Sequence, residues 1–218
     1  MPIERIWKYL AMEMTTTMKM KEQGLRVELI ETAKRALSDG LIWGSAGNFS
    51  VRDPQTGNIL ITPSGVEYTN MLPADIVTLG LDGGKLEGKL QPSIEAPVHC
   101  AVYRARPDVE AVVHTEPQYV NAFGTARVEM PIVTHNLGKI NKSIQIGPWI
   151  ASGSEAFAEE TSTLLGDEYA IIWPNHGLLV AGSSIYDAYM HSWCLENNAK
   201  VYILAKMLGE PQPPAEGY

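Results

Sequence analysis

The sequence predicts one α/β domain in which antiparallel strands, joined by turns, are mixed with helices. Apolar residues recur at helical spacing over 27–38 and 184–208. Short apolar runs such as 59–62 and 109–114 are bounded by glycine, proline, asparagine or aspartate, as strands and their turns are. Neither an internal repeat nor a linker divides the body of the 218-residue chain, and this length can bury one large core.

The N-terminal half is expected to contain one helix and several short strands. Residues 1–24 are a methionine-rich helix or arm, and the domain itself spans 25–210. The helix over 27–38 is stopped by Gly40. A glycine-bearing loop then leads into a strand ending at Arg52, and the following strands and hairpin turn are expected at 59–62, 76–79 and 82–84.

The C-terminal half is expected to alternate helices and strands. The helices are predicted at 94–104, 118–126, 155–165 and 184–208. Strands are predicted at 109–114, 130–134, 169–173 and 178–180, and the segment 143–149 leads into a glycine/serine turn. Ser154 is a natural cap for one helix, and Gly209 ends the last one. The tail, residues 211–218, is too rich in proline to pack regularly.

Composition excludes several classes of partner. The formal net charge of −8 and the absence of a basic run argue against nucleic acid. No apolar run approaches the length that spans a membrane, and the N-terminus does not resemble a signal peptide. Cys100 and Cys194 form neither a metal-type spacing nor a disulfide framework. We therefore expect a cytoplasmic protein that acts on small molecules.

Three residues at the ends of predicted strands could bind a metal. His114 and Glu116 are two apart, so their side chains point to the same face of an extended segment, and His176 follows another strand. Such a set suits a divalent metal used as a Lewis acid, or non-haem iron. A solvated turn with an incidental histidine explains an isolated His-x-Glu more often. Glu95 and His99, four apart on a predicted helix, form a rival ligand pair or a structural hydrogen bond, and we favour the structural interpretation.

Several glycine-containing turns could bind an anion through backbone N–H groups and hydroxyls. They contain Asn48, Ser64, Gly65 and Ser93. Taken singly, each is better explained as ordinary turn chemistry. Composition and spacing by themselves therefore predict a soluble α/β domain with a candidate metal site.

A resemblance extends this interpretation. Six blocks occur in order along residues 25–208, namely Gly47-Asn48-Phe-Ser-Val-Arg52, Ile61-Thr-Pro-Ser64-Gly65, Pro92-Ser93-Ile94-Glu95, Tyr103 with Arg106-Pro107-Asp108, Val113-His114 and Asn175-His176-Gly177. Together they resemble the class II sugar-phosphate aldolase family, which includes L-fuculose-1-phosphate aldolase, L-ribulose-5-phosphate 4-epimerase and the adducin head. The resemblance implies an α/β/α sandwich around a mostly antiparallel sheet, assembled as a homotetramer with active sites between subunits.

The resemblance also assigns roles. It implies that His114 and His176 are zinc ligands and that Glu95 takes and returns a proton at the carbon next to a carbonyl. It places Asn48, Ser64, Gly65 and Ser93 at the substrate phosphate. The implied reaction makes or cleaves a carbon–carbon bond in a small hydroxyketone or sugar phosphate, with an aldehyde as partner, through an enediolate.

Three positions depart from the family pattern. Glu116 stands where a second histidine is usual, which favours a harder metal such as manganese or iron, or removes a ligand. Ile94 replaces a serine, so the phosphate site loses a donor or the substrate is unphosphorylated. His135 aligns loosely with a tyrosine proton donor lent by a neighbouring subunit, and a histidine there can still act as an acid.

We therefore expect a divalent-metal-dependent aldolase. Epimerases, dehydratases and decarboxylases share the same enediolate chemistry, although epimerases usually carry aspartate at the position of Glu95. A non-catalytic, adducin-like oligomeric module is the alternative from another class. An iron oxygenase is a third possibility, suggested by two histidines and a carboxylate.

Overall fold

The structure is a computed structural model that describes residues 3–137 and 144–212. Within these residues, eight strands form one sheet in the order β4-β3-β2-β1-β5-β8-β7-β6, and every neighbouring pair is antiparallel except β6 and β7. The strands are β1 (Asn48–Arg52), β2 (Ile59–Ile61), β3 (Val77–Leu79), β4 (Lys85–Glu87), β5 (Ala111–Thr115), β6 (Gln145–Ile146), β7 (Ala170–Trp173) and β8 (Gly177–Gly182). The helices are α1 (Ile3–Ser38), α2 (Ala96–Ala105), α3 (Gln118–Ala126), α4 (Glu155–Leu165) and α5 (Ile185–Leu208), with short 3₁₀ turns at Tyr68–Asn70 and Pro73–Asp75.

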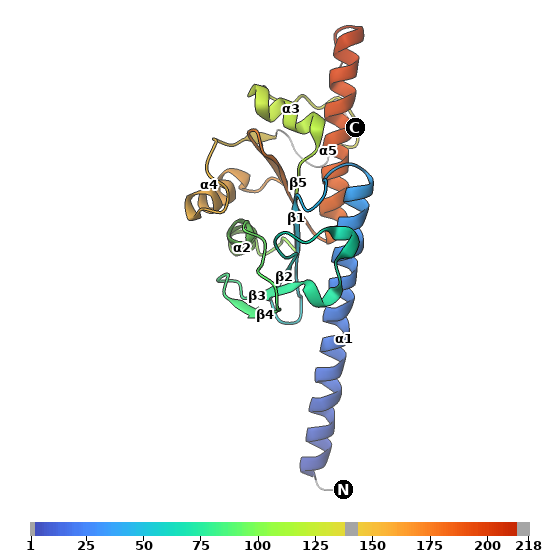
Figure 1. Cartoon of the computed structure of the whole chain (residues 1–218), viewed down its shortest axis with the longest axis vertical. Coiled ribbons are helices and arrows are strands. Elements are labelled where there is room, and N and C mark those ends of the chain that lie inside the picture. The colour runs from blue at the N-terminus through green and yellow to red at the C-terminus, as the bar shows by residue number, and fades with distance from the viewer. Residues whose placement is uncertain (1–2, 138–143, 213–218) are drawn as a thin grey trace.

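Helices cover both faces of the sheet (Figure 1). Alternate strand residues point to opposite faces. Phe49, Val113 and Val180 pack with α1, α3 and α5 in one apolar core. Val112, Leu179 and Ile171 pack with α2 and α4 in the other. The expected α/β/α sandwich around a mostly antiparallel sheet is confirmed.

Helix α1 extends well beyond the sheet (Figure 1). The helix expected over 27–38 therefore begins much earlier, at Ile3, and continues through Gly24. Its C-terminal part contributes buried side chains such as Leu29, Ile30 and Ala33 to the core. None of the helices in the described part of the chain combines the length and hydrophobicity needed to cross a membrane.

The predicted strand at 130–134 is wrong. This segment runs along α5, where the side-chain oxygen of Asn198 accepts hydrogen bonds from the backbone N–H groups of Val133 and Thr134. The Asn198 amide nitrogen donates to the carbonyl of Pro131. A side chain thus satisfies the backbone groups that a neighbouring strand would otherwise pair. Ser143, at the start of another predicted segment, and residues 213–218 of the predicted tail lie outside the described residues.

His114 lies on a central strand of the sheet. Strand β5 lies between β1 and β8, and His114 is opposite Asn48 on one side and Leu179 on the other. Because Val112 faces α2 and α4, His114, two residues later, faces them too. The first residues of α2 therefore meet His114 on this side of the sheet.

Candidate metal centre and proton-transfer site

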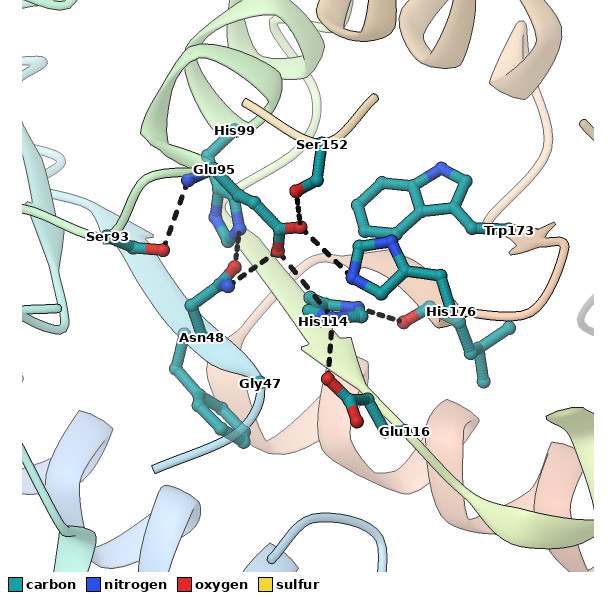
Figure 2. A network of polar contacts seen from close by, with 12 residues as sticks. Gly47, Asn48, Ser93, Glu95, His99, His114, Glu116, Ser152, Trp173 and His176 are labelled. Carbon is teal, nitrogen blue, oxygen red and sulfur yellow. Dashed lines mark hydrogen bonds and ion pairs between the residues drawn. The ribbon is translucent and has the colours of Figure 1, made fainter. Parts of the chain in front are cut away.

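Glu95 lies at the centre of a polar network (Figure 2). It directly precedes α2 and is only 3% exposed. Its Oε2 atom accepts a hydrogen bond from the Asn48 amide at 2.7 Å, and its Oε1 atom accepts one from the Ser152 hydroxyl at 2.5 Å. The Nε2 atoms of His176 and His114 lie 3.2 Å from Oε1 and 3.6 Å from Oε2 respectively. Both carboxylate oxygens are thus held, each by a hydrogen-bond donor and a histidine.

His114 presents one ring nitrogen to this network without a hydrogen-bond partner. Its Nδ1 lies 3.2 Å from the carbonyl oxygen of Leu178, which can only accept, so Nδ1 carries the hydrogen. Its Nε2 is buried and has no hydrogen-bond partner among the described residues. A histidine that donates through one nitrogen and points the other at a carboxylate and a second histidine has the arrangement of a metal ligand.

His176 is positioned by the turn between β7 and β8. Its ring stacks on Trp173, with 5.1 Å between ring centroids. Asn175 adopts a left-handed conformation at φ 57° and accepts a hydrogen bond from Arg127. A side chain at Gly177, directly after His176, would collide with the carbonyl of Thr115 and come within 2.7 Å of the His114 ring. Glycine at this position therefore allows β8 to approach β5 beside the site.

Glu95, His114 and His176 form the candidate metal cluster, and their ligand atoms lie within 4.8 Å of one another. The unpartnered Nε2 atom of His114 shows that the residues fit a metal, because a buried lone pair without a donor favours a cation. Glu116 lies at the edge of this cluster, with Oε1 3.8 Å from His114 Nε2. The structure thus brings two of the predicted ligands, His114 and His176, together with Glu95, and leaves the third, Glu116, at the edge of the cluster.

The electrostatics of the metal-free cluster are those of buried ion pairs. Burial raises the pKa of Glu95, but the charge of His114 and hydrogen bonds from His176, Asn48 and Ser152 together hold that pKa well below its usual range. Burial lowers the pKa of His114, yet Glu95 and Glu116 raise it overall. The proximity of His114 lowers the pKa of Glu116. A cation is therefore favoured at this point, whether it is a proton on His114 or a metal.

The turns that were expected to bind an anion lie side by side. The backbone N–H of Ser64 donates to the carbonyl of Gln91, and that of Ser93 donates to Thr62. Ser64 and Gly65 are exposed, whereas Ser93 is buried and its hydroxyl accepts a hydrogen bond from the backbone N–H of Glu95. The fourth expected residue, Asn48, uses its amide to contact Glu95 and His99.

Two features of the network were missed at the level of sequence. Ser152 lies in the turn before α4, and nothing in its spacing linked it to Glu95. It lines a cavity of about 190 Å³ together with Trp149, Phe157 and His176. The Asn48 side chain joins Glu95 to His99. The two-residue spacing along β1 and the four-residue spacing at the start of α2 are similar in length, and a comparison of the two would have indicated this connection.

His135 lies away from the cluster in this single chain. It is exposed and follows the segment that Asn198 holds against α5. Among the described residues, His135 is not part of the cluster of Glu95, His114 and His176, and its role as a proton donor stays a prediction.

Comparisons with known proteins agree on one family. The sequence profile described as class II aldolase and adducin N-terminal domain matches residues 27–203. The 5-deoxy-D-ribulose 1-phosphate aldolase of Bacillus thuringiensis is 32% identical, over 86% of this chain and 88% of that protein. The 3-oxo-tetronate 4-phosphate decarboxylase of Escherichia coli is 31% identical, over 84% of this chain and 88% of that protein. A solved L-fuculose 1-phosphate aldolase superposes with a TM-score of 0.84 at 27% identity, covering 88% of this chain and 91% of that one.

Proposed function

The chain belongs to the class II aldolase and adducin N-terminal domain family, and from this premise we propose that it is a divalent-metal-dependent aldolase acting on a small hydroxyketone or sugar phosphate. The observation that carries the proposal is the juxtaposition of a buried carboxylate, Glu95, with two histidines whose ring nitrogens converge on it. Aldol chemistry next to a carbonyl requires these two parts, a base and an electrophile.

His114 and His176 would hold the metal, with Glu116 as the proposed carboxylate ligand and Glu95 beside them as the base. A metal bound there supplies polarisation of a carbonyl oxygen. Zinc is the element we propose first. Manganese or iron is the alternative, since Glu116 adds a hard oxygen donor beside the two imidazoles.

Glu95 is the proposed base. Its carboxylate takes a proton from the carbon next to the substrate carbonyl, the C–H bond breaks, and the electron pair is left on an enediolate. The enediolate carbon then bonds to the carbonyl carbon of an aldehyde, and the aldehyde oxygen receives a proton. Cleavage follows the same steps in reverse. Because its pKa is held low, Glu95 is ionised at neutral pH, which is the form that a base must have.

Metal content tests the assignment directly. Elemental analysis of purified protein should find about one metal per chain. His176→Ala should lose both the metal and aldol activity, measured with dihydroxyacetone phosphate or dihydroxyacetone and a panel of aldehydes. His191→Ala is the matched control, because His191 pairs with Asp187 on α5 and should keep both. Metal retained in full by His176→Ala would contradict the site.

The substrate phosphate is proposed to bind at Ser64, Gly65 and Ser93, beside Asn48. Ile94 lies at this place with 67% of its surface exposed, so it offers an apolar side chain where a hydroxyl would favour an anion. Ile94→Ser should therefore lower the KM for a phosphorylated ketone more than for dihydroxyacetone. Equal changes for both substrates would mean that the anion binds elsewhere.

We propose that the functional form is a homotetramer and that His135 supplies a proton in the site of a neighbouring copy. Its exposed position on a segment anchored to α5 supports this role. Mixing His135→Ala with Glu95→Gln chains, followed by refolding together, should restore part of the activity that each variant alone has lost. Hybrids without activity would argue that both residues serve the same chain.

A decarboxylase is the second candidate, favoured by the 31% identical 3-oxo-tetronate 4-phosphate decarboxylase. Loss of carbon dioxide from a 3-oxo acid gives the same kind of enediolate, but it does not require a base to remove a carbon-bound proton. Glu95→Gln separates the two reactions, since it should abolish aldol chemistry while leaving the decarboxylation step itself less affected.

A further inference from the structure

His99 is a completely buried histidine that the proposed reaction does not use. It is 0% exposed, and each of its ring nitrogens lies 2.6 Å from an oxygen. Nδ1 faces the hydroxyl of Ser50. Nε2 faces the side-chain oxygen of Asn48 (Figure 2). The Asn48 amide in turn donates to Glu95, so the hydrogen bonds of the His99 side chain reach the Glu95 carboxylate through Asn48.

The direction of each hydrogen bond follows from the chemistry of the groups. The ionised carboxylate of Glu95 only accepts, so the amide nitrogen of Asn48 faces it. The amide oxygen of Asn48 also only accepts, so Nε2 of His99 carries a hydrogen. Burial lowers the pKa of His99 to about 3, which makes the ring neutral and leaves Nδ1 as an acceptor.

The same logic continues away from Glu95. With Nδ1 an acceptor, the Ser50 hydroxyl donates to it. The Ser50 oxygen can then accept from the hydroxyl of Tyr103, which lies 2.8 Å away. Every donor from Tyr103 to Asn48 thus points toward Glu95. Hydrogen bonds aligned in this way polarise one another, which strengthens the last donor in the chain.

The spacing of the sequence explains how this chain of contacts forms. Glu95, directly before α2, and His99 and Tyr103 on α2 are spaced four residues apart, or about 6 Å along the helix axis. Asn48 and Ser50 are two apart on β1 and repeat about every 6.6 Å. The two repeats nearly match, so side chains of the helix and the strand alternate along the contact.

We propose that His99 is a positioning residue which, through Asn48, anchors Oε2 of Glu95 and leaves Oε1 as the oxygen that exchanges the proton. The inference rests on the proposed role of Glu95 as the base. Oε1 is on the accessible side, because its hydroxyl donor, Ser152, is exposed, whereas Asn48 and His99 are buried. A fixed carboxylate plane keeps the base aligned with the C–H bond that it breaks.

Two substitutions of His99 test this role. His99→Leu removes the group that donates to the Asn48 side chain, so the Asn48 amide is free to rotate. His99→Gln keeps one N–H donor and one acceptor at this position. The probe is exchange of the carbon-bound hydrogens of dihydroxyacetone phosphate in D₂O by metal-loaded protein. His99→Leu should lower the maximal rate by about 10- to 100-fold, with a half-saturating concentration within about threefold of the original protein. His99→Gln should recover most of the loss.

Tyr103→Phe is the matched control, because it removes a buried hydroxyl from the far end of the same chain without touching Asn48. It should lower the melting temperature but leave the exchange rate within about threefold. The proposal is overturned if His99→Leu exchanges at the original rate, if folded His99→Gln does not recover, or if Tyr103→Phe loses as much activity as His99→Leu.

A second measurement does not depend on turnover. NMR of ¹⁵N-histidine-labelled protein should show His99 as a neutral ring with hydrogen on Nε2 between pH 6 and 9. A ring that carries hydrogen on Nδ1, or on both nitrogens, would overturn the proposed direction of the chain. If the original protein shows this tautomer but does not catalyse exchange, the proposed function fails while the contacts from His99 to Glu95 stand.

Discussion

The two oxygens of Glu95 are held by two different kinds of structure. On the buried side, Oε2 meets Asn48 from a central strand, supported by His99 from α2. On the accessible side, Oε1 meets Ser152 from the turn that precedes α4. Each side donates one hydrogen bond to the same carboxylate. The two donors differ in what holds them in place, which is a packed strand for Asn48 and a turn for Ser152.

This difference separates positioning from exchange. Residues on packed strands and helices lie in fixed rotamers, since their neighbours fill the space around them. An exposed turn can move at lower cost. We therefore expect the buried side to determine where the carboxylate lies, and the accessible side to give way when a substrate or metal arrives.

Gly177→Ala should have the largest effect, because it acts on His114, which faces Oε2 of Glu95. The added methyl would collide with the carbonyl of Thr115 and press on the ring of His114. We expect loss of metal binding and activity, with a cost of about 1–3 kcal/mol in the free energy of unfolding. Gly24→Ala makes the same chemical change in open space on α1 and should stabilise the protein by about 0.5–1 kcal/mol. Elemental analysis measures the metal content of the two variants, and urea denaturation measures their free energies of unfolding. A Gly177→Ala protein that binds a full complement of metal would contradict the close packing of β8 beside His114.

Asn48→Ala should have the next largest effect. It leaves Glu95 and His99 without their shared partner in a buried place, which costs about 1–3 kcal/mol in the free energy of unfolding. The hydrogen exchange rate of dihydroxyacetone phosphate should fall by about 100-fold, since the base is no longer held. A variant that is unstable but fully active would show that Asn48 supports the fold and not the base.

The metal-free protein should lose stability as the pH rises above neutral. The pKa of His114 is raised by Glu95 and Glu116 despite burial, so its ion pairs stabilise the fold fully below its unfolded pKa of about 6.5. That contribution is lost as the pH rises through the folded pKa. Thermal unfolding of EDTA-treated protein between pH 6 and 9 measures the effect. Glu95→Gln should flatten the profile, and an unchanged slope would mean that another group is responsible.

Ser152→Ala should have the smallest effect, although it removes the 2.5 Å hydrogen bond to Glu95. Because Ser152 is exposed, water can replace its hydroxyl. We expect less than about 0.5 kcal/mol of destabilisation, together with a fall in exchange rate of less than about tenfold. Urea denaturation and the exchange assay test both values. An effect as large as that of Asn48→Ala would remove the distinction between the two sides.

Much of the fold could be predicted because its signals are local. Helices α3 and α4 have the predicted bounds, and the Ser154 hydroxyl accepts the backbone N–H of Phe157 as a cap should. The segment 130–134 was predicted wrongly because Asn198, more than 60 residues away, takes its backbone hydrogen bonds. Such a long-range partner leaves no trace in local propensity.

The candidate site divides in the same way. His114, Glu116 and His176 could be selected because metal-capable side chains at strand ends are visible in the sequence. The contact from His99 to Asn48 was missed, although the four-residue repeat on α2 and the two-residue repeat on β1 are both written in the chain. Ser152 could not be found, because its place beside Glu95 depends on how the turn before α4 packs against a residue more than 50 positions earlier in the chain.

The most direct measurement is hydrogen exchange of dihydroxyacetone phosphate in D₂O, followed by ¹H NMR, for metal-loaded original protein and Glu95→Gln. Both proteins should contain the same amount of metal. The original protein should exchange one carbon-bound hydrogen, and Glu95→Gln should do so at least about 100-fold more slowly. Equal rates in the two proteins would contradict the assignment of Glu95 as the base.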